Sequence, residues 1–274
     1  MKSSAGRIPY VNLQEQWLEE RSDLLPIIDK VLESAQFVGG DELDKFEENI
    51  AKLCGTKYAC GLNSGTDALM LALSLSGIGK GDEVITPPNS FIASTAAIVH
   101  IGATPVFVDV LSDQNIDPSK IEAAITKKTK AIMPVHLTGR MCDMDSIMDI
   151  AKKYDLKVIE DAAQSVGSKY KGRLSGSIGN IGCFSTHPLK NLNACGDGGF
   201  LTTNDEVVYN KSRSYRNHGM VNRNIVDHFG SVTRMDNLQA SILNYRLGKL
   251  GEVTQKRRNN AKLYLDNINN QDIF

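Results

Sequence analysis

The sequence predicts an α/β fold, in which a mainly parallel sheet of about seven strands is flanked by helices. From residue 58 onward, short apolar runs alternate with segments whose apolar residues recur at helical spacing. The short runs are almost continuously apolar, which is typical of strands that are covered by helices on both faces. With 274 residues, the chain is long enough for one large domain of this kind.

An N-terminal arm is expected to precede this alternation. We assign residues 1–37 to the arm and expect one helix in it, over residues 24–34. A second helix, over residues 40–53, opens the large domain, which we place at residues 38–234. Four apolar residues fall on one face of that second helix: Leu43, Phe46, Ile50 and Leu53.

Strands and helices are expected to alternate regularly through the large domain. The predicted strands cover residues 58–62, 83–86, 105–108, 131–135 and 157–160. The helices between them cover residues 66–75, 92–101, 119–125 and 144–154. Strands over 180–185 and 199–203 follow, joined by a glycine- and asparagine-rich loop, and then a helix over 205–216. A last helix, over 235–267, belongs to a separate segment of residues 235–274.

Composition narrows the class of function. The net charge is −1 and the charged residues are spread along the chain. The sequence therefore shows no cluster of positive charge of the kind that binds nucleic acid or an anionic membrane. No stretch approaches the roughly 20 apolar residues that span a bilayer, and the N-terminus lacks an apolar signal core. The five cysteines are scattered without paired spacing, which predicts free thiols and no metal site. We therefore expect a cytoplasmic protein that acts on small molecules.

The residues that follow the strands are the candidates for a binding site, because ligands bind beyond the carboxyl ends of strands in open α/β sheets. The segment of residues 63–69 follows a strand and opens a helix. There Gly65 lets the backbone turn closely, Thr66 offers a hydroxyl, and the helix start offers free N–H groups that suit a phosphate. An ordinary capped turn would have the same sequence.

Two more strand ends are followed by residues that could contact a cofactor. Phe91 follows one strand and could lie flat on a ring-shaped cofactor, or make a plain hydrophobic contact. Asp161 ends an apolar strand, where a carboxylate is costly to bury unless it meets a cation. A protonated pyridine nitrogen is one such cation; a helix cap or a metal ligand is the alternative for this residue.

Lys190 lies in the loop after a later strand, together with Ser185. Its neighbours Pro188, Leu189 and Asn191 carry no charge, and desolvation lowers the pKa of a lysine and frees its amine to attack a carbonyl. A loop lysine is usually a solvated charge, but the glycine-rich residues 195–199 indicate a backbone that packs closely around a ligand. Taken together, these strand ends predict a pyridoxal 5'-phosphate enzyme whose Lys190 carries the cofactor as a Schiff base.

Seven segments then carry a resemblance to a known family. The chain resembles the sugar aminotransferases of the DegT/DnrJ/EryC1/StrS family, which have the fold type I architecture of aspartate aminotransferase. The segments run in the family's order over roughly residues 8–250, and each alone is unspecific while the combination is highly specific. They are residues 63–69, 81–87, 102–109, 134–139, 160–164, 187–192 and 196–199.

The resemblance implies a role for each matching residue. Lys190 would bond to the cofactor and shuttle the proton of the transfer. Asp161 would pair with the pyridinium nitrogen, Gln164 would approach the 3-hydroxyl of the ring, and Phe91 would stack on its face.

The resemblance also implies the phosphate site, the substrates and the assembly. Gly65, Thr66 and Ser185 would hold the cofactor phosphate. Members of the family transfer an amino group, usually from glutamate, to a keto sugar carried on a nucleotide, and they are homodimers. A sugar dehydratase that uses the same cofactor is an alternative function. Related dehydratases have histidine in place of the lysine, so the presence of Lys190 argues against it. A non-catalytic binding or regulatory protein on the same fold is a further alternative.

Two departures from the family are visible. Val232 stands where members often have an asparagine that reaches the phosphate in the partner subunit, so Ser231 or Thr233 is expected to replace that contact. Members also continue into a small C-terminal domain that helps to close the site, which this sequence lacks, and we expect a fragment. Five residues could line the substrate pocket or be structural: His136, His187, Arg216, Asn217 and His218.

Overall fold

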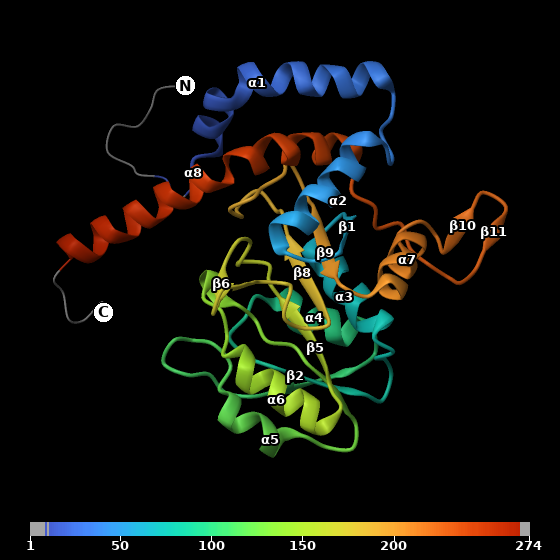
Figure 1. Cartoon of the computed structure of the whole chain (residues 1–274), viewed down its shortest axis with the longest axis vertical. Helices are drawn as coiled ribbons and strands as arrows, with labels where there is room; N and C mark the ends of the chain where they lie inside the picture. Colours follow the sequence, from blue (N-terminus) through green and yellow to red (C-terminus); the bar gives the residue numbers. More distant parts are fainter. Residues whose placement is uncertain (1–8, 10, 269–274) are drawn as a thin grey trace.

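The computed structural model describes residue 9 and residues 11–268 and is built around a seven-stranded sheet with the strand order β1-β9-β8-β5-β4-β2-β3 (Figure 1). Helices flank the sheet, so the predicted α/β fold is confirmed. The strands are β1 (Tyr58–Leu62), β2 (Glu83–Thr86), β3 (Thr104–Phe107), β4 (Thr129–Ile132), β5 (Lys157–Asp161), β8 (Ile181–Ser185) and β9 (Gly199–Thr203).

The sheet is mainly parallel, as predicted. β9 pairs antiparallel with both of its neighbours, β1 and β8, and the remaining neighbours pair parallel to one another. β1 therefore runs in the same direction as β8, and every strand of the sheet except β9 ends at the same edge. We call this edge the carboxyl edge. It gathers loops that are far apart in the sequence.

The helices after α1 lie close to their predicted positions. They are α2 (Asp41–Cys54), α3 (Gly65–Leu75), α4 (Ile92–His100), α6 (Met144–Tyr154), α7 (Glu206–Tyr215) and α8 (Asn237–Asn267). The helix predicted over 119–125 is instead a 3-10 turn, Pro118–Lys120, followed by the short α5 (Ile121–Ala124). Asp117 caps this turn through a hydrogen bond from the Ser119 N–H at 3.0 Å.

The predicted start of the first helix is wrong. α1 spans Leu13–Ser34 and so begins well before residue 24. The side chain of Asn12 caps it by accepting a hydrogen bond from the Glu15 N–H at 3.1 Å. Only Leu24 and Val31 of this helix are buried, so its first turns carry no continuous apolar face that would have predicted them.

Both faces of the sheet are covered, as the continuous apolar strands predicted. Successive residues of a strand point to opposite faces. In β5, Ile159 packs in one cluster with Leu69 of α3, and Val158 packs in another with Ile147 of α6. The same alternation holds in β2, where Val84 and Ile85 belong to the two different clusters.

A third cluster joins α2 and α8 to the antiparallel part of the sheet. The rings of Phe184 and Phe200 stack there at 4.5 Å, and Leu243 of α8 is buried in the same cluster. α1 lies along α8 (Figure 1), and Arg246 of α8 donates to the Glu20 carboxylate of α1 at 2.7 Å. The first half of α8 therefore packs with the large domain. Our division at residues 37 and 234 stays a prediction.

Two short hairpins were not predicted: β6 (Lys169–Tyr170) with β7 (Arg173–Leu174), and β10 (Met220–Asn222) with β11 (Ile225–Val226). The β10–β11 hairpin projects from the body of the molecule (Figure 1). Strands this short have too few residues to show a two-residue period. Within residue 9 and residues 11–268, no helix has the length and apolar composition needed to cross a membrane.

Candidate active site

A cavity of about 1100 Å³ opens at the carboxyl edge of the sheet. Its walls come from the segments that follow β1, β2, β4, β5 and β8, with further residues from α8 and from the chain before α1. All of the predicted site residues line this one cavity: Gly65, Thr66, Phe91, Asp161, Gln164, Ser185 and Lys190.

The segment after β1 brings the start of α3 against the ends of β8 and β9. Ser64 caps α3 by accepting a hydrogen bond from the Asp67 N–H at 3.0 Å. A Cβ on Gly65 would lie 2.7 Å from the Cβ of Ser185, so a side chain at this position would push the two segments apart. A Cβ on Gly199 would meet the Gly65 nitrogen at 2.5 Å. As at every helix start, the first N–H groups of α3 have no acceptor inside the helix, and Gly65 and Thr66 place them at the cavity wall.

Asp161 ends β5 and is 4% exposed. Its carboxylate accepts hydrogen bonds from the Ser94 hydroxyl at 2.6 Å and from the Ala163 N–H at 3.2 Å. Burial raises the pKa of Asp161, and the Ser94 and Ala163 donors oppose that rise only in part. A cation close to the carboxylate would therefore stabilise its ionised form.

The preceding residue, Glu160, has a structural role. Its carboxylate accepts hydrogen bonds from His136 Nε2 at 3.0 Å and from the N–H groups of Gly176 at 2.8 Å, Ile178 at 2.8 Å and Gly179 at 2.6 Å. His136 Nδ1 accepts a hydrogen bond from the Cys142 N–H at 3.3 Å. His136 is fully buried, and both of its ring nitrogens have a hydrogen-bond partner within the protein. Of the two readings left open for His136, the structural one is confirmed.

Gln164 follows β5 and is held by the loop after β4. Its Oε1 accepts a hydrogen bond from the Thr138 N–H at 2.8 Å. This bond orients the amide, because the oxygen is used by the backbone and the Nε2 group remains as a donor. Thr138 also lines the cavity, and it has a positive φ of 55°, an uncommon conformation for a residue with a branched side chain.

Phe91 precedes α4 and is 70% exposed although it lines the cavity. A large ring that is left this open does not contribute to the core. Of the two alternatives for Phe91, contact with a bound molecule agrees better with this exposure than a plain internal contact does.

Lys190 lies in the turn after β8 and is half-buried. Its N–H donates to the His187 carbonyl at 2.8 Å, and the Ser185 hydroxyl accepts from the His187 N–H at 3.3 Å. Burial lowers the pKa of the Lys190 ammonium, and the nearby negative charge of Asp161 opposes this. A lysine with a lowered pKa releases its proton more easily and is a better nucleophile at neutral pH.

Several cavity residues were not predicted from the sequence. Ser90 and Ser94 come from the loop before α4 and from α4 itself, while Arg257 and Asn260 come from α8. Arg257 makes no ion pair with an acidic side chain of the described residues. Serine in a helix and arginine on an exposed helix are both common, so neither pattern predicted a site.

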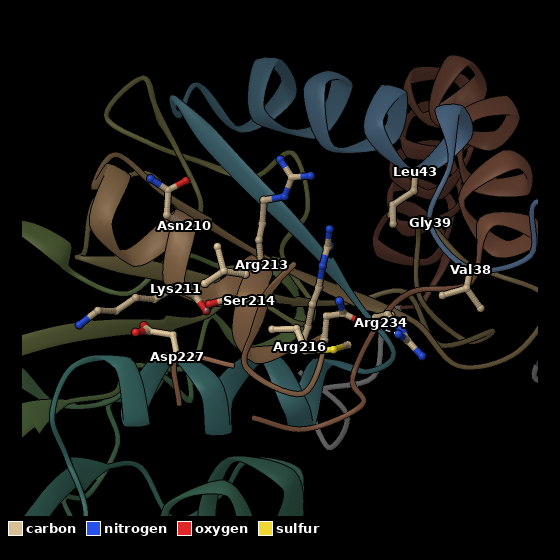
Figure 2. Close-up of a pocket in the computed structure, with 13 residues that line it drawn as sticks. Val38, Gly39, Leu43, Asn210, Lys211, Arg213, Ser214, Arg216, Asp227 and Arg234 are labelled. Atoms are coloured by element: carbon tan, nitrogen blue, oxygen red, sulfur yellow. Dashed lines mark hydrogen bonds between the residues drawn. The ribbon is translucent and has the colours of Figure 1, made fainter. Parts of the chain in front are cut away.

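A second cavity, of about 650 Å³, lies between α7, the β10–β11 region and residues 38–43. It is lined by Arg216 and Asn217, while His187 lines the first cavity and His218 lines neither. Arg216 forms a buried ion pair with Glu47 and donates to the Gly61 carbonyl at 2.6 Å, so its role is structural. Figure 2 shows that Lys211 extends away from the arginines of this cavity. The positively charged groups of the cavity therefore do not converge on one point.

Val232 lies next to this second cavity, in a bridge with Asn217. Its side chain is 49% exposed. Of the two neighbours expected to replace the missing asparagine, Thr233 is buried and Ser231 is exposed. Only Ser231 therefore presents a hydroxyl that a second chain can reach.

The first cavity fits pyridoxal phosphate in its chemistry. At one wall, the hydroxyls of Thr66 and Ser185 lie beside the free N–H groups of a helix start, a combination that suits a phosphate. At another, the buried Asp161 carboxylate lacks a cation, which a pyridinium nitrogen supplies. Lys190 provides an amine with a lowered pKa in the same cavity.

Comparison with known proteins agrees with this chemistry. The chain is 46% identical over 264 residues to the dTDP-3-amino-3,6-dideoxy-alpha-D-galactopyranose transaminase of Aneurinibacillus thermoaerophilus, covering 96% of this chain and 73% of the relative. It is 44% identical over 268 residues to the UDP-N-acetyl-3-dehydro-alpha-D-glucosamine 3-aminotransferase of Acidithiobacillus ferrooxidans, covering 97% and 72%.

Solved structures show the same fold. The DesV protein of S. venezuelae, in complex with a ketimine intermediate, superposes with a TM-score of 0.87 at 41% identity, covering 90% of this chain and 67% of DesV. The NtdA protein of Bacillus subtilis, solved with the bound cofactor PMP, has a TM-score of 0.85 at 37% identity, covering 90% and 57%.

These similarities confirm the expected aminotransferase activity and the pyridoxal phosphate cofactor. A family model matches residues 19–274, which is nearly the whole chain. The chain therefore belongs to the DegT/DnrJ/EryC1/StrS aminotransferase family.

Proposed function

We propose that this aminotransferase moves an amino group from glutamate to a keto sugar carried on a nucleotide, and that the predicted residues hold its cofactor. The observation that carries the assignment of the site is the gathering of all those residues around one cavity, with a buried carboxylate that lacks a cation. The sugar substrate is supported by the names of the relatives, which print both a dTDP sugar and a UDP sugar.

The residues around the cavity divide into two ends. Gly65, Thr66 and Ser185 hold the phosphate through N–H groups and hydroxyls at the end formed by α3 and β8. Asp161 pairs with the ring nitrogen, and the free Nε2 of Gln164 donates toward the 3-oxygen of the ring. Phe91 covers one ring face.

Lys190 is the catalytic base of this proposal. When bound, pyridoxal phosphate supplies an electron sink that stabilises negative charge on the carbon next to the amine. The Lys190 amine would hold the cofactor and would be freed when an amino substrate is bound. It would then take the proton from the substrate carbon that bears the amine and return it to the carbon on the other side of that nitrogen. Over the full cycle glutamate becomes a keto acid and the sugar carbonyl becomes an amine, so no outside oxidant is needed.

The assembly is proposed to be a homodimer. The projecting β10–β11 hairpin and its flank carry apolar side chains in water, and Phe229 is fully exposed there. Large exposed apolar patches are typical of protein interfaces. Ser231, on the same segment, is the hydroxyl that we propose reaches toward the partner's cofactor phosphate. The other exposed apolar residues of the hairpin are Val221, Ile225 and Val226.

A cytoplasmic location is proposed as well. All five cysteines are free thiols, and four of them are buried. Free thiols persist in a reducing compartment, where disulfides are rare.

The proposal is tested by following the two half-reactions separately. Glutamate added to the cofactor-loaded protein is expected to bleach the yellow absorption band of the lysine-bound cofactor. A 3-keto nucleotide sugar added next is expected to restore the band and to yield an amino sugar by mass spectrometry. A protein that bleaches with glutamate but is never restored by dTDP- or UDP-linked keto sugars would contradict the proposed substrate. A protein that does not respond to glutamate, but does respond to another amino acid, would contradict the donor.

A further inference from the structure

Ser94 is a buried hydroxyl that contacts the centre of the candidate site. It lies in the first turn of α4 and is 1% exposed. Its Oγ is 2.6 Å from Oδ2 of Asp161. This is the shorter of the two hydrogen bonds that the carboxylate accepts. The helix does not need this hydroxyl, since α4 has no side-chain cap and the Ser94 N–H already donates to the Phe91 carbonyl at 3.1 Å.

The direction of the hydrogen bonds follows from the chemistry of the groups. An ionised carboxylate only accepts, so the Ser94 hydroxyl must donate its proton to Asp161. The Ser94 oxygen is then free to accept from the Ser90 hydroxyl, which lies 2.7 Å away. A single line of donors therefore runs from Ser90 through Ser94 to Asp161, and the donation to Oδ2 is charge-assisted.

The carboxylate is held at both oxygens. Ser94 donates to Oδ2 and the Ala163 N–H donates to Oδ1, which fixes the plane of the group. The other titratable groups that act on Asp161 are His136 after β4, Lys190 after β8, and Cys183, a buried thiol of β8. His136 is committed to Glu160 and Cys142, and Lys190 is the residue that bonds to the cofactor. Among the described residues, Ser94 is therefore the one side chain that donates a hydrogen bond to the Asp161 carboxylate.

We propose that Ser94 is a positioning residue of the transamination reaction: it keeps the Asp161 carboxylate ionised and oriented toward the ring nitrogen. The inference rests on the proposed cofactor site. Because Phe91 and Ser94 lie one turn apart at the start of α4, this helix also fixes the ring-facing side chain relative to the carboxylate. α4 thus controls two contacts to the ring from one rigid element.

The test compares Ser94→Ala, Ser94→Thr and Ser90→Ala with Ser241→Ala, a matched control. Ser241 is also a buried helical serine, but its hydroxyl donates only to the Leu238 carbonyl at 2.8 Å in α8. The dissociation constant for pyridoxal phosphate is measured at pH 6 and at pH 8, together with kcat and KM. Circular dichroism and thermal unfolding identify any variant that does not fold.

Loss of a hydrogen bond to a charged group predicts a weakening of cofactor affinity on the order of ten- to hundredfold in Ser94→Ala. The ratio of its dissociation constant to that of the wild type is expected to be larger at pH 6 than at pH 8, because Asp161 without this donor is protonated more easily. Lys190 titrates in both proteins, and comparing them at the same pH removes the part of its titration that is common to both. kcat is expected to fall with little change in KM. Ser94→Thr keeps the hydroxyl and is expected to restore affinity, Ser90→Ala to have a smaller effect, and Ser241→Ala to have none.

Two results would overturn the inference. One is a folded Ser94→Ala protein whose cofactor affinity is within twofold of wild type at both pH values. The other is a weakening that is the same at pH 6 and pH 8, as a purely structural role would produce. If Ser94→Ala does not fold, Ser94→Thr and Ser90→Ala decide by the same pH ratio. Borohydride labelling of the wild type separates the two levels: wild type that is not labelled at Lys190 refutes the proposed site and this inference together, while labelled wild type with an unaffected Ser94→Ala refutes this inference alone.

Discussion

Glu160 and Asp161 are consecutive, buried carboxylates of β5, and their pKa values are shifted in opposite directions. Burial alone would raise both. In Glu160 the hydrogen bonds from His136 and from three backbone N–H groups overcome burial and lower the pKa. In Asp161 only two donors oppose burial, and the pKa stays raised.

The two neighbouring carboxylates at the end of β5 therefore have different roles, a structural one for Glu160 and a ligand-binding one for Asp161. Successive side chains of a strand point to opposite faces, so Glu160 faces the loop of residues 176–179 and Asp161 faces the cavity. Glu160 is fully satisfied by the protein. Asp161 is the carboxylate that gains most from a cationic ligand, and this is why the site is assigned to it.

Asp161→Asn is expected to stabilise the protein without cofactor at pH 7 and to weaken cofactor binding. The raised pKa means that the folded state of the wild type holds a proton more tightly than the unfolded state. The Asp161 contribution to stability is therefore present below the ordinary pKa of 3.8 and is lost as the pH rises through the folded-state value. Urea unfolding of the apo-proteins from pH 4 to pH 8 is expected to show an advantage of the Asn variant that grows with pH. A constant difference would contradict the assignment of the buried charge.

Glu160→Ala is expected to destabilise the protein by more than about 3 kcal/mol, because several buried donors each lose their acceptor at a cost of about 1–3 kcal/mol. Glu122→Ala is the matched control, since Glu122 pairs with Lys153 at the surface and should change stability little. The folded-state pKa of Glu160 lies below its ordinary value of 4.5, so its stabilising effect is present above that pH and is lost as the pH falls through the folded-state value. Urea unfolding measures both. Equal effects of the two substitutions at pH 7 would show that Glu160 is not a buried anchor.

Gly65→Ala is expected to damage the phosphate end of the cavity. Its Cβ would lie 2.7 Å from Ser185 Cβ and 3.1 Å from Ser185 Cα, so the start of α3 and the end of β8 must separate. Overpacking of this kind costs about 1–3 kcal/mol, and we expect cofactor affinity to fall at least tenfold. Gly248→Ala is the control, because a Cβ at that position of α8 meets nothing within 4 Å and alanine favours the helix. Wild-type affinity in Gly65→Ala would refute the close-approach argument.

The rate at which apo-protein takes up pyridoxal phosphate is expected to rise with pH and to level off below 10.5, the ordinary pKa of lysine. Only the neutral amine attacks the aldehyde, and burial lowers the pKa of Lys190. Because the charge of Asp161 opposes that lowering, the midpoint should move to a still lower pH in Asp161→Asn. Stopped-flow absorbance gives both profiles. A midpoint at the ordinary lysine value in both proteins would show that Lys190 is not desolvated.

Much of the site could be predicted from the sequence because it is built on strand ends. Gly65, Asp161 and Lys190 each follow an apolar run, and the parallel order of the strands brings such positions to one edge. The direction of β9 could not be predicted, since an apolar period of two residues is the same for a parallel and an antiparallel strand.

Three of the cavity residues that the sequence did not predict lie on helices: Ser94, Arg257 and Asn260. Ser94 is an ordinary helical serine until the fold places it against Asp161, and Arg257 reaches the cavity from α8, far along the chain. His136 shows the converse. It was a candidate for the substrate pocket, but the hydrogen bonds to Glu160 and Cys142 turn it into the interior.

The bond between cofactor and protein is the most direct test of the whole account. Wild-type protein loaded with pyridoxal phosphate is reduced with borohydride, digested and analysed by peptide mass spectrometry. We predict that the added mass of the reduced cofactor lies on Lys190, and that Lys190→Ala protein remains folded but is not labelled. Labelling of a different lysine in the wild type, or an unchanged yellow band in Lys190→Ala, would contradict it.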